Sequence, residues 1–342
     1  MMGTYVYGSK PFGEQLEEAL QIYVRDGLKS DERERIIDEI IECFINYKIR
    51  PSDYFLFGFD SVNRTDEIRK NFVTDLCKDT TLFEIEGKKH YLELSDKYSF
   101  YKKAKEFFRR QLLFVDSTTQ VEDIHLFTAQ TKDLFVKPNS GSYGHGAFLA
   151  KVNNENDSIE LYNSLKEKGG TWLLEERIIQ DPEMAQWNAS SVNTIRFTSI
   201  LNKKGFHPLT PVLRCGRKGS IVDNGGSGGI LANIDINTGV IYTDGLDENN
   251  VVYTHHPDSG IIFKGTTIPQ WESLMKFVER LHRSVCPSHH YVGWDLAFSR
   301  GQWLVIEGNW GQFLNQYVDK RGRKDEFLKY MSEEPFLIEL NV

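Results

Sequence analysis

Two acidic residues near the C-terminus stand inside apolar segments, where a carboxylate needs a partner or a chemical role. Asp295 belongs to the apolar segment 291–298 and Glu307 to the apolar segment 302–309, with an Arg-Gly pair between them. Two such segments around a short turn that contains glycine predict a β-hairpin. The pairing register of this hairpin decides whether the two carboxylates meet.

A hairpin loop with an odd number of residues, centred on Gly301, places Asp295 opposite Glu307 on one face of the sheet. A two-residue turn made of Arg300 and Gly301 would place the two acids on opposite faces. We expect the odd loop, with Gly301 in a left-handed conformation. Asn309 lies two residues after Glu307 and therefore shares its face.

Two carboxylates and an amide oxygen on one face predict a metal site. Burying like charges together is costly unless a cation neutralises them. Oxygen ligands without histidine or cysteine favour Mg²⁺, which proteins usually share with nucleotide phosphates. The alternative is a solvated hairpin whose acids are unrelated. The sequence thus predicts Mg²⁺ bound by Asp295, Glu307 and Asn309.

A second segment combines a lysine with a glycine-rich loop. A short apolar run ends at Lys137, and another apolar run begins near residue 147. Glycines let a backbone approach a phosphate and point its N–H groups at it. The loop fits a flap over phosphates with Lys137 beneath, and a plain β-hairpin explains the pattern equally well. The flap residues would be Ser140, Gly141, Gly144 and Gly146.

A third segment, residues 171–179, is an apolar strand that ends in acidic residues. Such a strand end suits adenine, because a carboxylate or backbone carbonyl at Glu175 accepts a hydrogen bond from the base. Ile178 or Ile179 would cover the ring. The alternative is an ordinary strand end that carries surface charge.

Three further positions are candidates for substrate contacts or catalysis. Arg196 lies inside an expected strand over residues 194–201. It either binds a phosphate or a carboxylate of the substrate, or it forms a structural ion pair with an acid such as Glu183. Asp223 and Asn224 precede a glycine run and either orient a substrate or make a turn. His256 is a candidate base or a structural loop histidine.

The secondary structure expected to position these residues is mostly helical in the first hundred residues and mixes strands with helices beyond residue 134. Helical spacing of apolar residues predicts helices over residues 14–25, 31–47 (with Ser30 as N-cap) and 66–76. Residues 81–94 alternate like a short hairpin with its turn at Gly87, and residues 96–113 read as a helix capped by Ser95 or Asp96. Beyond residue 134, short apolar strands alternate with glycine-rich loops and helices.

Composition excludes several classes of protein. The 342 residues carry 41 basic and 49 acidic side chains, a net charge of −8, which argues against a general nucleic-acid binder. No apolar run reaches the roughly 18 residues that span a bilayer, and no signal peptide is recognisable. The four cysteines are scattered, which fits a reducing, cytoplasmic compartment and no zinc site.

The order of the motifs resembles the ATP-grasp superfamily over roughly residues 85–315. Segments 191–199, 222–230, 256–260 and 293–295 look specifically like its sugar-transfer-associated branch. The resemblance implies an α+β fold in which two subdomains clamp ATP. The expected division is an N-terminal helical region over residues 1–84, a subdomain with the flap over residues 85–180, and a subdomain with the Mg²⁺ site over residues 181–342.

The resemblance also implies roles for individual residues. Lys97 and Lys137 would bind the ATP phosphates, the neighbourhood of Glu175 would bind adenine, and Glu183 would bind the ribose hydroxyls. Two departures concern the acceptor side. Many ATP-grasp ligases carry an arginine where this chain has Gly293, and a Pro-Gly turn where it has the sequence Trp-Gly-Gln at 310–312.

The function implied is an ATP- and Mg²⁺-dependent ligase that joins a carboxylate to an amine through an acyl phosphate. The branch suggests a sugar acid, an amino sugar or an amino acid as substrate, in the biosynthesis of a surface polysaccharide. Two alternatives stay open: a phosphotransferase acting on a sugar hydroxyl, with Asp223 or His256 as base, and a nucleotide-binding protein without turnover.

Overall fold

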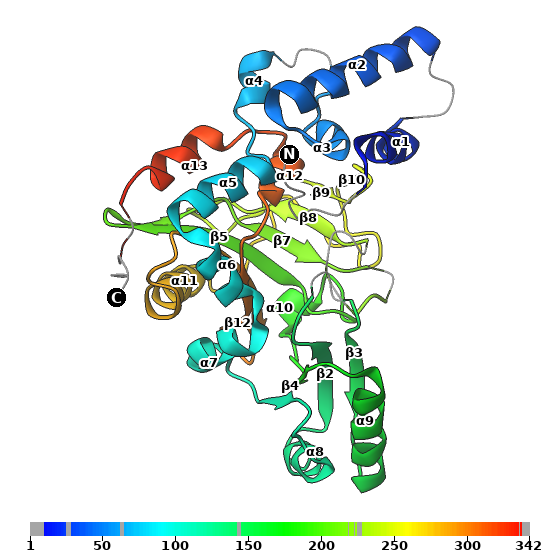
Figure 1. Cartoon of the computed structure of the whole chain (residues 1–342), viewed down its shortest axis with the longest axis vertical. Coiled ribbons are helices and arrows are strands. Elements are labelled where there is room, and N and C mark those ends of the chain that lie inside the picture. The colour runs from blue at the N-terminus through cyan, green and yellow to red at the C-terminus, as the bar shows by residue number, and fades with distance from the viewer. Residues whose placement is uncertain are drawn as a thin grey trace.

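The structure, a computed structural model, describes residues 10–24, 29–61, 65–141, 145–217, 219–221, 223, 228–334 and 336. Two antiparallel sheets form its framework, and helices cover them and extend from one end (Figure 1). The fold class is α+β, as expected. Within the described residues, no helix has the length and apolar character that crossing a bilayer requires. The four cysteines are all free.

Four N-terminal helices pack around a hydrophobic cluster of their own, to which Tyr317 adds its ring. They are α1 (Phe12–Tyr23), α2 (Ser30–Tyr47), α3 (Pro51–Leu56) and α4 (Asp66–Lys70). The first two confirm the helices expected from apolar spacing. The expected N-cap is wrong: Ser30 is the first helical residue of α2, and the N-cap position belongs to Lys29, whose side chain makes no capping bond.

The helix expected over residues 66–76 ends at Lys70, and three helices follow where a hairpin and a longer helix were expected. They are α5 (Asp75–Ile85), α6 (Gly87–Ser95) and α7 (Lys97–Phe108). The hairpin over residues 81–94 is wrong, because the Thr74 hydroxyl caps a new helix and Gly87, at φ 74°, only separates two helices. Asp96 caps α7 as expected, but α7 ends at Phe108 because Arg109 takes a left-handed conformation.

The smaller sheet has the strand order β1-β4-β2-β3. Its strands are β1 (Leu112–Val115), β2 (Asp133–Pro138), β3 (Phe148–Lys151) and β4 (Trp172–Glu176), and α8 (Val121–Thr128) and α9 (Glu155–Lys168) pack against one face. Leu134, Val136 and Leu174 point to these helices. Since side chains alternate along a strand, Lys137 and Glu175 lie on the opposite face.

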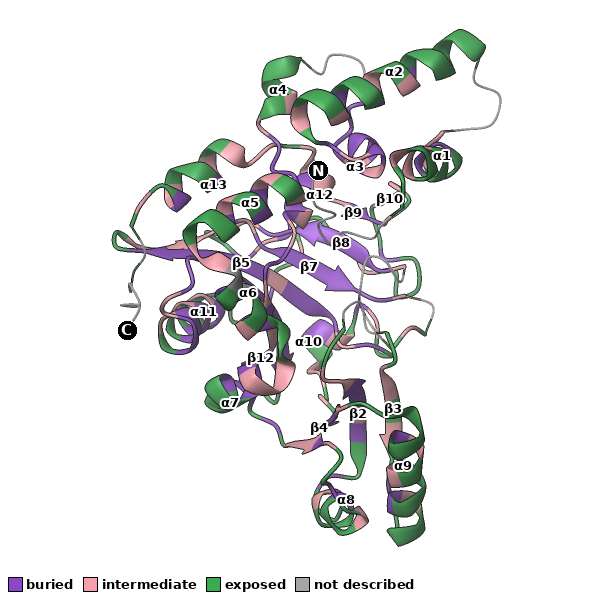
Figure 2. Cartoon of the chain, in the orientation of Figure 1, coloured by how far each residue is buried: buried purple, intermediate pink, exposed green. Residues whose placement is uncertain are grey.

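The larger sheet has the strand order β10-β9-β8-β7-β5-β11-β12, with β6 paired to the end of β5. Figure 2 shows that its central strands are almost wholly buried. The strands are β5 (Thr194–Asn202), β6 (Gly205–Pro208), β7 (Val212–Cys215), β8 (Ile230–Asn233), β9 (Gly245–Leu246), β10 (Val252–Tyr253), β11 (Tyr291–Ser299) and β12 (Gln302–Asn309). The remaining helices are α10 (Pro182–Ala185), α11 (Trp271–Val285), α12 (Leu314–Asp319) and α13 (Lys324–Met331).

The main hydrophobic core lies against this larger sheet. The helix α11 contributes one apolar face, with Leu274, Val278 and Leu281 fully buried. The helix α7 packs on β12, where Phe100 fills the space beside Gly308. Leu82 of α5 belongs to the same core, so the packing continues across residue 84 without interruption.

The hairpin of β11 and β12 pairs Asp295 with Glu307, as expected, but by a different route. The turn has only two residues, Arg300 and Gly301, at φ 53° and 70°, so the expected odd loop is wrong and the expected left-handed Gly301 is confirmed. A β-bulge next to Asp295 absorbs one extra residue, Ile306. This extra residue offsets the even turn and brings the two acids opposite each other.

Candidate active site

Strand register places five charged or polar side chains on one face of the larger sheet. Asp295 lies between Arg196 on β5 and Glu307 on β12, its direct partners in the two ladders. Arg214 on β7 lies opposite Thr194, which is two residues from Arg196. Because alternate residues of a strand share a face, all of these side chains emerge together.

A ladder of ion pairs runs across this face. The Arg196 guanidinium contacts both carboxylate oxygens of Asp295, with Nε at 2.5 Å and Nη2 at 3.0 Å. Arg214 donates to Asp295 at 3.0 Å and to Asp223 at 3.2 Å. The Thr194 hydroxyl donates to the same Asp223. Asp223 thus holds Arg214, and Arg214 and Arg196 together hold Asp295.

Arg196 therefore points into the site, but its partner in this structure is Asp295. The alternative of an ion pair with an acid therefore holds, but the acid is Asp295 and not the suggested Glu183, which lies exposed on α10. Asp223 is joined to the cluster, as a candidate site residue should be. Asn224 lies outside the described residues.

The two central acids differ in the direction in which their pKa is shifted. Burial alone would raise the pKa of Asp295, but Arg196 and Arg214 outweigh it and hold that pKa well below its usual range. Burial and the neighbouring Asp295 raise the pKa of Glu307. The two carboxyl groups hydrogen-bond each other, and Glu307 is the weaker acid of the pair.

Asn309 completes the set with an oxygen that lacks a partner. Its Oδ1 is buried, and no hydrogen-bond donor reaches it among the described residues. It lies beside Gly293, where a Cβ atom would come within 3.1 Å of it, and beside Gly311, where a Cβ atom would come within 2.9 Å. The two glycines thus leave this oxygen a narrow open space.

These residues fit Mg²⁺ by their chemistry. Within the described part of the chain, no three His, Cys, Asp or Glu side chains converge as a metal-binding group. The set is instead two carboxylates, Asp295 and Glu307, with the unsatisfied amide oxygen of Asn309, and such hard oxygen donors suit Mg²⁺. An ion here would also relieve the cost of placing two buried acids side by side.

The smaller sheet contributes a second cluster around Glu175. Lys137 Nζ lies 2.8 Å from its carboxylate, and Arg110 contacts the other oxygen at 2.7 Å. Burial alone would raise the pKa of Glu175, but these two cations lower it to about 2. The carboxylate is therefore paired with Arg110 and Lys137, so of the two acceptors expected at Glu175 for adenine, only the backbone carbonyl is compatible with these ion pairs.

This cluster predicts a loss of stability in acid. A carboxyl group whose pKa is near 4.5 unfolded and about 2 folded stabilises the protein above pH 4.5, and this contribution disappears as the pH falls through 2. The effect is on the order of 3 kcal/mol. Urea unfolding from pH 6 to pH 3 measures it: Glu175→Gln should be less stable at pH 6 and flatten the profile, whereas the exposed control Glu167→Gln should keep the wild-type profile. Equal slopes for all three proteins would contradict the assignment.

Lys97, at the start of α7, holds the beginning of the expected flap. Its Nζ donates to the backbone oxygen of Gly141 at 2.6 Å, and the next backbone N–H donates to the side chain of Asn139 at 2.9 Å. Burial lowers the pKa of Lys97, although Glu307 lies near enough to raise it. Lys137 of the smaller sheet and Lys97 of α7 both lie near enough to Glu307 to lower its pKa, against the opposing effects of burial and Asp295.

The other flap residues are only partly described. Ser140 and Gly141 are solvent-accessible, and Gly146 has φ 77° and packs beside Pro138. Gly144 lies outside the described residues.

The segment after β4 crosses from the smaller sheet to the larger. Ile178 is half-buried and Ile179 is exposed, and the backbone oxygen of Ile179 accepts a hydrogen bond from Ser299. Asp181 accepts hydrogen bonds from the backbone N–H groups of both turn residues, 300 and 301. The expected adenine and ribose residues, Ile178 and Glu183, thus lie on a segment fixed to the hairpin turn.

His256 is a structural histidine in this geometry. It is fully buried, its Nε2 donates to the backbone oxygen of Gly216 at 2.9 Å, and its Nδ1 accepts from the backbone N–H groups of residues 258 and 259. Burial lowers its pKa. With both ring nitrogens occupied, the expected role as a base is wrong.

Sequence reasoning missed two groups that support the site. Arg110 follows the end of α7, where nothing in the sequence marks it as a partner of Glu175. Lys78 and Asp75 lie on α5, next to a segment that was interpreted as a hairpin. The only available signal was their spacing of three residues on a helix, which is common on solvated helix surfaces.

Comparisons with known proteins identify the family of the chain. A sequence profile described as "Sugar-transfer associated ATP-grasp" matches residues 83–326. No curated protein matches.

Several solved structures are similar to part of the chain. D-alanine–D-alanine ligase from Bacillus anthracis is 14% identical, with a TM-score of 0.41 over 70% of this chain and 66% of its own. The corresponding ligase from Helicobacter pylori is 12% identical, with a TM-score of 0.44 over 70% of this chain and 61% of its own. The ATP-grasp ligase PsnB, solved with its minimal precursor, Mg and ADP, is 10% identical, with a TM-score of 0.42 over 72% and 62%. The chain thus spans less than two thirds of these proteins, and similarities of this size do not extend to substrates or partners.

Proposed function

Since the chain belongs to the sugar-transfer associated ATP-grasp family, we propose that it is an ATP- and Mg²⁺-dependent ligase that joins a carboxylate to an amine. One observation carries the proposal. Glu307, the partner of Asp295 in the acidic pair, lies within electrostatic range of two lysines, Lys97 and Lys137. A nucleotide phosphate chain with its metal ion fits between groups of these charges.

Each residue then has a stated task. Asp295, Glu307 and Asn309 hold Mg²⁺, which neutralises phosphate charge when bound. Lys97 and Lys137 bind phosphate oxygens, and the loop that begins at Ser140 and Gly141 closes over them. Ile178 and Glu183 lie on the crossing segment and contact the adenine and ribose.

Arg196 and Asp223 serve the acceptor side. Arg196 stands at the edge of the ion-pair ladder, where its guanidinium fork reaches a substrate carboxylate. Asp223 orients Arg214 through their ion pair. These two arginines supply the positive charge that many members of the superfamily place at the position of Gly293.

The reaction proceeds in two balanced steps. A carboxylate oxygen attacks the γ-phosphorus of ATP, the bond to the β-phosphate oxygen breaks, and ADP leaves. The amine then attacks the acyl phosphate, phosphate leaves, and the amine loses one proton to give an amide. The protein contributes position and charge neutralisation, and it keeps water from the reactive intermediate.

The family description links the chain to sugar transfer, which supports a proposal on its biological setting. We propose a sugar acid, an amino sugar or an amino acid as substrate, a product used in a surface polysaccharide or another sugar-linked compound, and a cytoplasmic location. We also retain the division into a helical region over residues 1–84 and two clamping subdomains, 85–180 and 181–342.

Thermal unfolding with Mg²⁺ and ATP tests the nucleotide site. Ligand at 100 times its Kd adds about 2.7 kcal/mol to the stability of the folded state. For a chain of this size the midpoint should rise by roughly 5–10 °C. ATP with EDTA should give a smaller shift. A folded protein whose midpoint does not move at millimolar Mg²⁺–ATP would contradict the proposal.

Hydroxylamine trapping then tests the reaction. With the correct acid and ATP, hydroxylamine should capture the acyl phosphate as a hydroxamate. A stable phosphorylated product without free phosphate would instead identify a phosphotransferase.

A further inference from the structure

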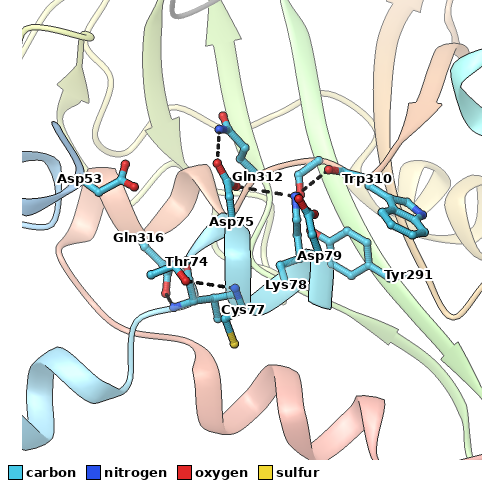
Figure 3. Close-up of polar contacts among 12 residues, drawn as sticks. Asp53, Thr74, Asp75, Cys77, Lys78, Asp79, Tyr291, Trp310, Gln312 and Gln316 are labelled. Carbon is cyan, nitrogen blue, oxygen red and sulfur yellow. Dashed lines mark hydrogen bonds and ion pairs between the residues drawn. The ribbon is translucent and has the colours of Figure 1, made fainter. Parts of the chain in front are cut away.

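A buried lysine outside the family match reaches the loop that follows the candidate metal ligands. Lys78 on α5 is only 2% exposed, and its Nζ donates to the backbone oxygen of Trp310 at 2.9 Å and to that of Gly311 at 3.4 Å. Figure 3 shows this side chain directed from α5 toward the loop. Residue 78 precedes the matched range, which begins at residue 83, and none of the roles above includes it.

An ammonium group in the interior is costly unless acids and carbonyls surround it. Asp79 lies 3.2 Å from Lys78 Nζ and Asp75 lies 3.7 Å from it. Arg50 in turn pairs with Asp75 at 2.9 Å, and Gln312 donates to the same carboxyl group at 2.9 Å. The lysine is therefore part of a closed polar network, which joins the N-terminal helices to the loop at 310–312.

A second donor fixes the same peptide from the sheet. The Tyr291 hydroxyl donates to the backbone oxygen of Gly311 at 2.7 Å. The ring of Phe83, also on α5, packs against the Trp310 ring with centroids 5.0 Å apart. Two elements far apart in the sequence thus hold one short stretch of backbone in place.

This stretch lies directly against the residues of the candidate site. The backbone of Gly311 passes so close to Gly293 that a Cβ atom there would lie 3.1 Å from it. A Cβ atom on Gly311 itself would lie 2.7 Å from Arg196 Nη1 and 2.9 Å from Asn309 Oδ1. Any shift of this peptide therefore changes the space around Asn309 and Arg196.

We propose that Lys78 is a positioning residue of the metal site, and that it fixes the 310–311 peptide so that Asn309 and Arg196 keep their places beside Asp295. This inference rests on the proposed function, because it concerns the Mg²⁺ that the site would bind. Lys78 touches neither nucleotide nor metal, and acts only through the backbone that it holds. Removal of such supporting contacts typically weakens metal binding or activity about 10- to 100-fold.

The test compares Lys78→Met with the wild type. Methionine fills a similar volume and donates no hydrogen bond. We expect the Mg²⁺ concentration for half-maximal ATP-dependent stabilisation to rise about tenfold or more, and nucleotide affinity measured with EDTA to stay unchanged. Hydrogen exchange should become faster in a peptide covering residues 308–316, and this readout is independent of bound metal and activity.

Two control variants separate positioning from stability. Lys105→Met removes an exposed lysine from α7, and Ile40→Ala opens a cavity in the N-terminal cluster. Neither should change the Mg²⁺ requirement. If Lys78→Met fails to fold, Tyr291→Phe removes the other donor to Gly311 while keeping the ring, and it should raise the Mg²⁺ requirement in the same direction.

The outcomes distinguish this inference from the proposed function. A wild type whose stabilisation by ATP does not depend on Mg²⁺ would overturn the proposed function, and this inference with it. A wild type that depends on Mg²⁺, with an unchanged Mg²⁺ requirement in folded Lys78→Met or in Tyr291→Phe, would overturn the inference alone.

Discussion

Glu307→Gln is expected to abolish turnover while the protein stays folded. The amide has nearly the same shape but carries no charge, so the metal site loses one of its two anionic ligands. The loss of several kcal/mol of electrostatic stabilisation corresponds to a decrease in kcat of at least about 100-fold. Phosphate release measures the activity, and the unfolding midpoint without ligands measures the fold.

Stability should survive this substitution for a physical reason. In the wild type, burial and the nearby Asp295 both oppose the charged form of Glu307 and raise its pKa. An uncharged amide avoids the cost of a second buried negative charge and can keep a hydrogen bond to Asp295. The exposed control Glu272→Gln should behave as wild type in both assays. Activity of Glu307→Gln within a few-fold of wild type would show that the metal assignment is wrong.

Lys137→Met is expected to weaken nucleotide binding by about 1.5–3 kcal/mol, or roughly 10- to 150-fold, because a charge-assisted hydrogen bond to phosphate is lost. Titration calorimetry with ATP and Mg²⁺ measures the change. Lys151→Met, an exposed lysine on β3 of the same sheet, serves as the matched control.

The ion pair with Glu175 complicates a single substitution, because Lys137 also helps to neutralise that buried acid. A double-mutant cycle with Glu175→Gln separates the two effects. If Lys137 binds phosphate, affinity falls in Lys137→Met whether or not Glu175 is present. If affinity is unchanged in the single and the double variant, the phosphate site lies elsewhere.

The sequence predicted the hairpin of β11 and β12 and the pairing of its two acids. It did not predict the β-bulge that produces this pairing. The apolar segments and the glycine turn were readable because they are local. The bulge at Ile306 was not, because an extra isoleucine looks like any strand residue. The odd loop was the wrong explanation for a correct pairing.

The contacts that surround the candidate site could not be read from spacing. Arg214 is 81 residues from Asp295, and Lys78 is 232 residues from Trp310. A pattern of residue types along the chain says nothing about which distant strands or helices become neighbours. His256 shows the opposite error, since a histidine that looked chemical in sequence is buried against backbone groups.

The error in α5 and α6 has a simple cause. Residues 81–94 mix a threonine, aromatic residues and a glycine in an order that also suits strands. The Thr74 cap and the tertiary packing of Leu82 favour the helix instead. Because that segment was read as a hairpin, the neighbouring Lys78 received no functional interpretation.

The chain passes between the two sheets twice, just before β1 and just after β4, and both crossings are bonded to the hairpin of β11 and β12. Arg109 bonds Gln302 and Arg110 bonds the backbone of Val305, while Asp181 bonds the hairpin turn. Both crossings are thus anchored to the same hairpin, at the end of the smaller sheet opposite to Gly141. Through these bonds, the hairpin that carries Asp295 and Glu307 also fixes the position of the smaller sheet, with Lys137 and Glu175, relative to the larger one.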